Sequence, residues 1–242
     1  LTEKPDGYTL VCLSSAALNA PVFQETEQFD MDKFKYVGSY MPQQRVVFTN
    51  LKTPYKNWEE FLDYVKAHPG EVTVGAGGGQ WSIATIKSIA VKEKLDLDYV
   101  TFKSGGDAAA AVLGGHVNVT DSGVGSATYQ AAVAGDLNLL LVLGNNKLED
   151  FPEILTIKEL GYPFICTREY GIMLHAEVSE EVRKFWEEAL KKTLEIPELI
   201  NKMEEVGFKP RFLPGDEYEK VARYAATSVI DLKEYNKVLE EE

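Results

Sequence analysis

The residues best suited to chemistry in this chain are a run of glycines, residues 75–82 (GAGGGQWS), between a strand-like stretch and a helical pattern. Gln80 stands where the dinucleotide fingerprint GxGxxG requires its third glycine, and the Gly-Lys-Ser/Thr of a P-loop is missing. What remains is a series of main-chain N–H donors ahead of a helix, which can cradle a carboxylate or similar anion. The alternative is a tight strand-to-helix turn that binds nothing.

Two further polar loops follow strand-like runs, at residues 103–106 (KSGG) and 121–126 (DSGVGS). Lys103 supplies a positive charge for an anion, or it is an ordinary exposed lysine. Asp121 binds an ammonium or hydroxyl group of a ligand, or it caps the following helix. Trp81, next to the glycines, packs against a ligand or against another part of the protein. These residue types indicate a cluster of binding loops, with a structural alternative for each member.

No constellation of catalytic or metal-binding residues accompanies these loops. The three histidines are widely spaced, and the motifs HExxH, GxSxG and CxxC do not occur. Cys12 and Cys166 are far apart in sequence, which favours two buried free thiols over a single disulfide. We therefore predict no enzyme, no cofactor and no metal ion. An α/β enzyme that uses residues 75–79 to hold a phosphate or carboxylate substrate is the alternative.

The elements that position these loops alternate between strands and helices, which favours βα units and mainly parallel sheets. Ligands of open α/β sheets bind at the carboxyl edge of the strands, so the three loops are expected to meet there. Strands are expected at residues 8–13, 36–40, 45–49, 71–74, 99–102, 117–120, 137–143 and 172–174, followed by a helical C-terminal part.

Composition narrows the classes of partner. The chain has 242 residues, 45% of them hydrophobic, which suits one large α/β domain or two small lobes. Its formal charge of −13 makes nucleic acid and anionic membrane surfaces unsuitable partners, although backbone donors can still bind an anion locally. No apolar run approaches the roughly 20 residues of a membrane span, and no signal peptide opens the chain at Leu1.

The order of short motifs along nearly the whole chain resembles the solute-binding receptors of tripartite tricarboxylate transporters, also called the Bordetella uptake protein family. Each motif is weak alone, but their conjunction in this order is specific. The matching stretches are residues 5–10 (PDGYTL), 34–54, 64–70 (YVKAHPG), 75–82, 102–106 (FKSGG), 113–117 (LGGHV), 151–156 (FPEILT), 159–161 (ELG) and 170–172 (YGI).

The resemblance implies a type II periplasmic-binding-protein fold with two lobes, joined by two crossing strands, that close over a carboxylate. It implies a first lobe at residues 1–49 and 144–242 and a second at residues 50–143. The ligand-binding residues implied in this way are Ser14, Ser15, Ala16 and Tyr170 in the first lobe, and Gly77, Gly78, Gly79, Gln80, Trp81, Ser82, Lys103, Ser104, Asp121 and Ser122 in the second.

It further implies a monomer outside the cytoplasm that delivers a di- or tricarboxylate, aromatic acid or amino acid to membrane permease subunits. A ligand sensor for a signalling protein would share the same site. Three features depart from the family pattern. Members begin with a strand, a glycine-rich loop and another strand before PDGYT, so we expect that segment to exist elsewhere. Ile83 replaces a frequent histidine, and the loop at residues 121–126 is one residue longer than usual.

Overall fold

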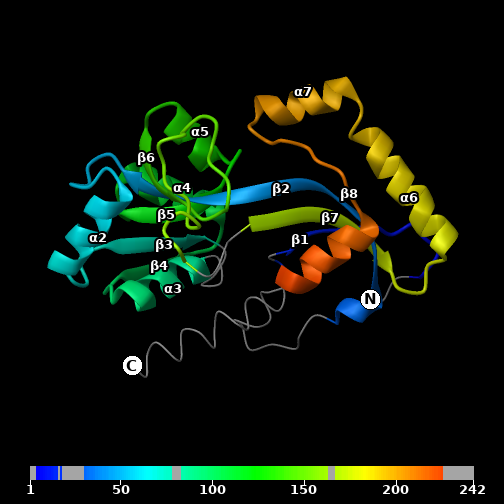
Figure 1. Cartoon of the computed structure of the whole chain (residues 1–242), viewed down its shortest axis with the longest axis horizontal. Coiled ribbons are helices and arrows are strands. Elements are labelled where there is room, and N and C mark those ends of the chain that lie inside the picture. The colour runs from blue at the N-terminus through cyan, green and yellow to red at the C-terminus, as the bar shows by residue number, and fades with distance from the viewer. Residues whose placement is uncertain (1–3, 16, 18–29, 78–82, 163–166, 226–242) are drawn as a thin grey trace. The chain divides into compact units, whose positions relative to one another are not determined.

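The computed structural model describes residues 4–15, 17, 30–77, 83–162 and 167–225 (Figure 1). These residues form two compact units. The first unit contains the described residues up to Gln43 and those from Arg168 onward, and the second contains those of Gln44–Thr167. Among the described helices, none is both long and apolar enough to span a bilayer.

The second unit is built on a sheet whose strands run in the order β6-β2-β5-β3-β4. The strand β3 is parallel to both β4 and β5, as the sequence predicts, whereas β2 is antiparallel to β5 and β6. The strands are β2 (Phe34–Asn50), β3 (Thr73–Gly77), β4 (Asp98–Phe102), β5 (Val119–Gly123) and β6 (Leu137–Val142).

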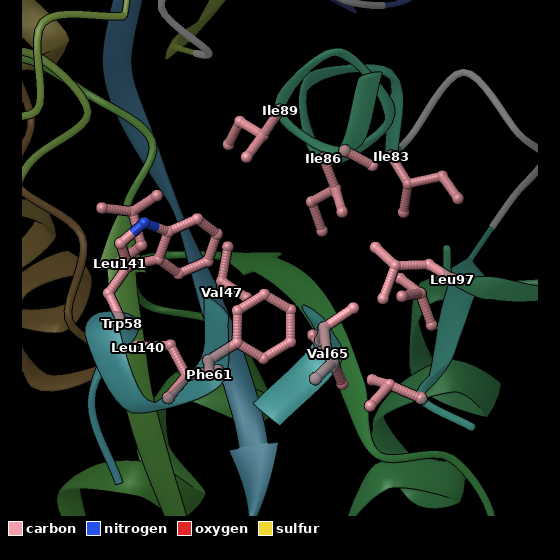
Figure 2. Packing of buried hydrophobic residues seen from close by; sticks show 14 of the residues in the cluster. Val47, Trp58, Phe61, Val65, Ile83, Ile86, Ile89, Leu97, Leu140 and Leu141 are labelled. Atoms are coloured by element: carbon pink, nitrogen blue, oxygen red, sulfur yellow. The ribbon is translucent and has the colours of Figure 1, made fainter. Parts of the chain in front are cut away.

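Helices cover both faces of this sheet: α2 (Trp58–Ala67) and α3 (Ala84–Glu93) on one, α4 (Gly105–Gly114) and α5 (Ala127–Val133) on the other. Side chains alternate between the two faces along β2, so Val47 points to the α2/α3 side while Val46 and Phe48 point to the α4/α5 side. The strand therefore contributes to two separate cores. Figure 2 shows Trp58, Phe61 and Val65 of α2 and the isoleucines of α3 meeting Val47 and Leu141. Each such side chain contributes about 1.5–3 kcal/mol through burial.

The segment after β6 belongs to the second unit, whereas residues 144–162 were expected in the first lobe. Its backbone is tied to β6, because Val142 N–H donates to Leu155 O at 2.9 Å and Ile157 N–H donates to Val142 O at 2.8 Å. Ile157 and Tyr162 complete the core between the sheet and α2/α3. The boundaries of the units therefore lie inside β2, after Gln43, and after Thr167, the first residue of β7 (Thr167–His175).

In the first unit, the described strand pairs are antiparallel, so the expected parallel pairing is found only between β3 and its neighbours β4 and β5 in the second unit. β1 (Val11–Ser14) pairs with β7, and β8 (Leu213–Pro214) pairs with the first part of β2. The helices are η2 (Met31–Lys33), α6 (Glu180–Thr193) and α7 (Pro197–Glu205), and residues 215–225 are also helical. Where two strands were expected around residues 36–49, β2 is one continuous strand.

Cys12 is exposed, which corrects the expectation of a buried thiol. Residues alternate along β1, so Val11 and Leu13 face the small core around Tyr36 and Tyr218 while Cys12 faces the opposite side. Its thiol is free. Cys166 lies outside the described residues.

Candidate functional site

The carboxyl ends of β3, β4 and β5 lie at one edge of the second unit's sheet, as the sequence predicts. Gly77, the last residue of β3, is in register with Phe102, the last residue of β4. On the other side of β3, Gly75 is in register with Thr120 of β5. The polar loops that follow these strands therefore start side by side. Of the predicted cradle, Gly77 is described, while Gly78, Gly79, Gln80, Trp81 and Ser82 lie outside the described residues.

Gly77 permits an unusually close approach of two of these loops. A Cβ atom at this position would lie 2.5 Å from Gly105 Cα and 2.8 Å from both Gly105 N and Ser104 O. Real Cβ atoms essentially never come so close to backbone atoms. The absence of a side chain at Gly77 therefore lets the end of β3 pack directly on the start of α4.

Ser104 begins α4 through a reciprocal pair of hydrogen bonds. Its Oγ accepts from Asp107 N–H at 3.2 Å, and its own N–H donates to Asp107 Oδ2 at 3.1 Å. The preceding Lys103 is exposed, and no hydrogen bond or ion pair ties its ammonium group to the described part of the chain. The start of α4 thus combines a helix N-terminus with a cation that is available to solvent.

Asp121 is buried and paired within the protein. Its carboxylate accepts a hydrogen bond from Arg45 Nε at 2.5 Å, and its main-chain oxygen accepts from Arg45 Nη2 at 2.9 Å. The side chains of Arg45 and Asp121 are only 7% and 2% exposed. Asp121 neither caps α5, which is capped by Ser126, nor faces solvent. Beside it, Ser122 Oγ donates to Ser126 Oγ at 2.9 Å.

In the first unit, the predicted residues Ser14, Ser15 and Tyr170 come together at the β1/β7 pair. Ser14 is in register with Tyr170. Ser15 is 1% exposed, and its Oγ accepts a hydrogen bond from Glu169 N–H at 3.1 Å. The Tyr170 hydroxyl donates to Gln43 Oε1 at 3.3 Å. Ala16 lies outside the described residues.

Three charged residues near these groups were missed by the sequence analysis: Arg45, Glu169 and Arg211. Glu169 is buried in β7, where its carboxylate accepts hydrogen bonds from Ser39 Oγ and Arg211 Nη2. Arg45 and Glu169 each stand within a strand, and a charge buried in a strand requires a partner. That pattern was the available signal in the sequence, although it does not identify the partner.

The site contains no cluster suited to a metal ion: no group of three or more His, Cys, Asp or Glu side chains converges in the described ranges. The available groups are hydroxyls, backbone N–H donors and cations. Such groups bind an oxyanion.

Comparison with known proteins agrees with this chemistry. Residues 2–231 match the family model of the tripartite tricarboxylate transporter family receptor. The chain belongs to this family. Among curated relatives, the UPF0065 protein in the gbd 5' region of Cupriavidus necator is 24% identical over 93% of this chain and 68% of its own length. BugT of Bordetella pertussis is 27% identical over 69% of this chain, which spans about half of BugT's length.

Solved structures of similar proteins establish the fold. The periplasmic binding protein BugD aligns with a TM-score of 0.84 at 17% identity, covering 98% of this chain and 81% of BugD. Two Rhodopseudomonas palustris proteins align likewise. Rpa4515 with adipate has a TM-score of 0.85 at 14% identity, and the alignment covers 98% of this chain and 80% of Rpa4515. MatC with bound malate has a TM-score of 0.80 at 19% identity, and the alignment covers 95% of this chain and 80% of MatC. The transporter receptor therefore has the type II periplasmic-binding-protein fold that its motifs implied.

Proposed function

We propose that this chain is an extracytoplasmic solute-binding protein that captures a small organic carboxylate and delivers it to the permease subunits of a tripartite tricarboxylate transporter. It binds without turnover, as a monomer. The observation that carries the proposal is the meeting of three polar strand ends at one sheet edge, in a chain that belongs to a receptor family. The adipate and malate bound to two similar structures support a carboxylate as the ligand.

In the second unit, the proposal assigns carboxylate contact to the start of α4. The unpaired N–H groups of a first helical turn and the positive end of the helix dipole favour a negative charge there. Lys103 adds a full charge directly before the cap at Ser104. The proposal retains Gly77, Ser122 and residues 78–82 as contacts of the same ligand.

In the first unit, the proposal assigns contact to Ser14, Tyr170 and Ala16. Ser15 and Asp121 take a different role, because both are buried and already paired with Glu169 N–H and Arg45 respectively. We assign them to holding the surrounding strands in place, rather than to touching the ligand.

Thermal unfolding with a panel of compounds tests the proposal. The panel contains the carboxylates malate, adipate, citrate, glutamate and benzoate. A nucleotide and a sugar phosphate represent the phosphate substrates that the alternative α/β enzyme would bind. An acid that binds should stabilise the chain by about 2.7 kcal/mol when its concentration is a hundred times Kd. Native mass spectrometry should then show one acid per chain. A shift with the phosphates and none with the acids would favour the α/β enzyme over the receptor.

Lys103→Gln should weaken binding of the panel acid with the largest shift by about tenfold and reduce the salt dependence of Kd. The reason is that the substitution removes a full charge while leaving the α4 cap at Ser104 intact. Lys158→Gln, at another exposed lysine of the second unit, is the matched control and should leave Kd unchanged. Isothermal titration calorimetry at two salt concentrations measures both effects. Equal Kd values for the two variants would remove Lys103 from the site.

A further inference from the structure

A buried network in the first unit has no assigned role in ligand contact. Glu169 is 7% exposed, and its carboxylate accepts one hydrogen bond from Ser39 Oγ at 3.0 Å and another from Arg211 Nη2. Burial raises the pKa of Glu169, while the Arg211 charge and the Ser39 hydrogen bond act in the opposite direction. Arg211 is therefore the group that makes an ionised carboxylate tolerable at this position.

Arg211 is held in place by the backbone. Its N–H donates to Tyr40 O on β2 at 3.0 Å, which fixes the segment between α7 and β8 against the strand. Its guanidinium is half exposed, whereas the Glu169 side chain is 9% exposed. The cation thus reaches the buried anion from the solvent side, and it can be removed by mutation without leaving a large internal cavity.

The network is connected directly to the residues proposed to bind the ligand. The main-chain N–H of Glu169 donates to Ser15 Oγ, and Tyr170 is the next residue along β7. Tyr170 is in turn in register with Ser14. The hydrogen bond from Glu169 N–H to Ser15 Oγ and the pairing of Ser14 with Tyr170 tie β1 to β7. A displacement of β7 at Glu169 therefore moves Ser14, Ser15 and Tyr170 together.

The titratable tyrosine and cysteine side chains near Glu169 carry no positive charge that could balance its carboxylate. Tyr218 lies in the helix at residues 215–225; burial is the main cause that raises its pKa, and the charges of Tyr36 and Glu169 act in the same direction. Tyr40 and Cys12 act on Tyr218 in the same direction, and Tyr170 acts on Tyr40. All of these groups are neutral or anionic, and Arg211 is the cation among the groups that act on Glu169.

We propose that the Glu169–Arg211 pair is a positioning and charge-balancing element of the ligand site, with Arg211 cancelling the negative charge that Glu169 would otherwise place beside a carboxylate ligand. The inference rests on the proposed function, since it concerns an anionic ligand. Neither residue touches the ligand.

Four variants of the 242-residue chain test this: Glu169→Gln, Arg211→Ala, Arg211→Lys and the double variant Glu169→Gln/Arg211→Ala. The probe is the panel acid with the largest thermal shift. Arg211→Ala should weaken binding at neutral pH by about tenfold or more, because the buried Glu169 charge is then uncompensated. The double variant should recover most of the lost affinity, because the negative charge of Glu169 is no longer present. Arg211→Lys should bind nearly as well as the unaltered chain.

The pH profile separates charge from structure. In Arg211→Ala, the pKa of Glu169 moves further upward, so the carboxyl becomes neutral as the pH falls towards mildly acidic values. Affinity should then improve with falling pH in this variant, while the double variant stays flat over the same range. If Arg211→Ala does not fold, Arg211→Gln serves the same comparison. A double variant as weak as Arg211→Ala at every pH would overturn the inference, and so would an Arg211→Ala variant that binds normally.

A ligand-free measurement completes the test. Because the folded-state pKa of Glu169 is raised, the folded chain binds more protons than the unfolded chain just above the ordinary glutamate range. The contribution of Glu169 to stability therefore falls as the pH rises from about 4.3 through the raised pKa. Glu169→Gln should remove this slope, and Arg211→Ala should extend it to higher pH. A chain that binds no panel acid refutes the proposed function, whereas normal binding with unaffected variants refutes this inference alone.

Discussion

Asp121→Ala is expected to lower the free energy of unfolding by about 3–5 kcal/mol, the typical cost of removing one partner from a buried ion pair. The substitution leaves the Arg45 guanidinium, 7% exposed, without the carboxylate that accepts its Nε hydrogen bond. Arg45 lies on β2 and Asp121 on β5; Arg45 is in register with Gly123, and Asp121 is in register with Val47, two residues further along β2. Chemical denaturation with urea measures the change.

Two controls give this result its meaning. Lys202→Ala removes a pair with Glu198 whose side chains are 68% and 78% exposed, and it should change stability by less than about 0.5 kcal/mol. Arg45→Met/Asp121→Leu removes both charges at once and should recover most of the stability, because no buried guanidinium then loses its carboxylate partner. Equal losses in the Asp121→Ala and Lys202→Ala variants would contradict the assignment of a buried pair.

The alternating pattern of strands, glycine loops and helices was sufficient to predict the three parallel strands of the second unit. Apolar runs before residues 75, 103 and 121 became β3, β4 and β5, because each run is short and is followed by a glycine-containing turn that ends it. By contrast, two strands were expected where β2 is one continuous strand that includes Pro42, a residue that disfavours the interior of a sheet. Residues 144–162 were misplaced because their core contacts are made with strands and helices distant in sequence.

The predicted site residues differ in how far sequence alone could assign them. The loop at residues 103–106 was correctly placed after a strand, because the apolar run and the glycines that follow it are local signals. The environment of Asp121 depends on Arg45, 76 positions away, and that of Ser15 on Glu169, 154 positions away. Strand pairing determines both, and nothing local in the sequence encodes it. A hydroxyl or carboxylate in a predicted binding loop therefore indicates the region of the site, while its direct role depends on the fold.

Gly77→Ala is expected to impair ligand binding more strongly than any single change at an exposed residue of the site. The new Cβ would overlap Gly105 Cα and Ser104 O, and neither backbone atom belongs to a flexible side chain that can move away. The end of β3 and the start of α4 must separate, at a cost of about 1–3 kcal/mol in stability. That displacement moves Lys103 and the first-turn N–H donors of α4, on which carboxylate binding is proposed to depend.

Gly105→Ala is the matched control, because Gly105 is in contact with Gly77 but a side chain added at Gly105 has free space around it. A Cβ at Gly105 would meet nothing within 4 Å, and alanine in the first turn of α4 should leave stability unchanged or raise it by up to about 1 kcal/mol. Thermal unfolding of both variants separates a packing constraint at Gly77 from a general intolerance of glycine replacement. If Gly77→Ala matched Gly105→Ala in stability and in Kd for the acid, the close approach of β3 to α4 would have no part in binding.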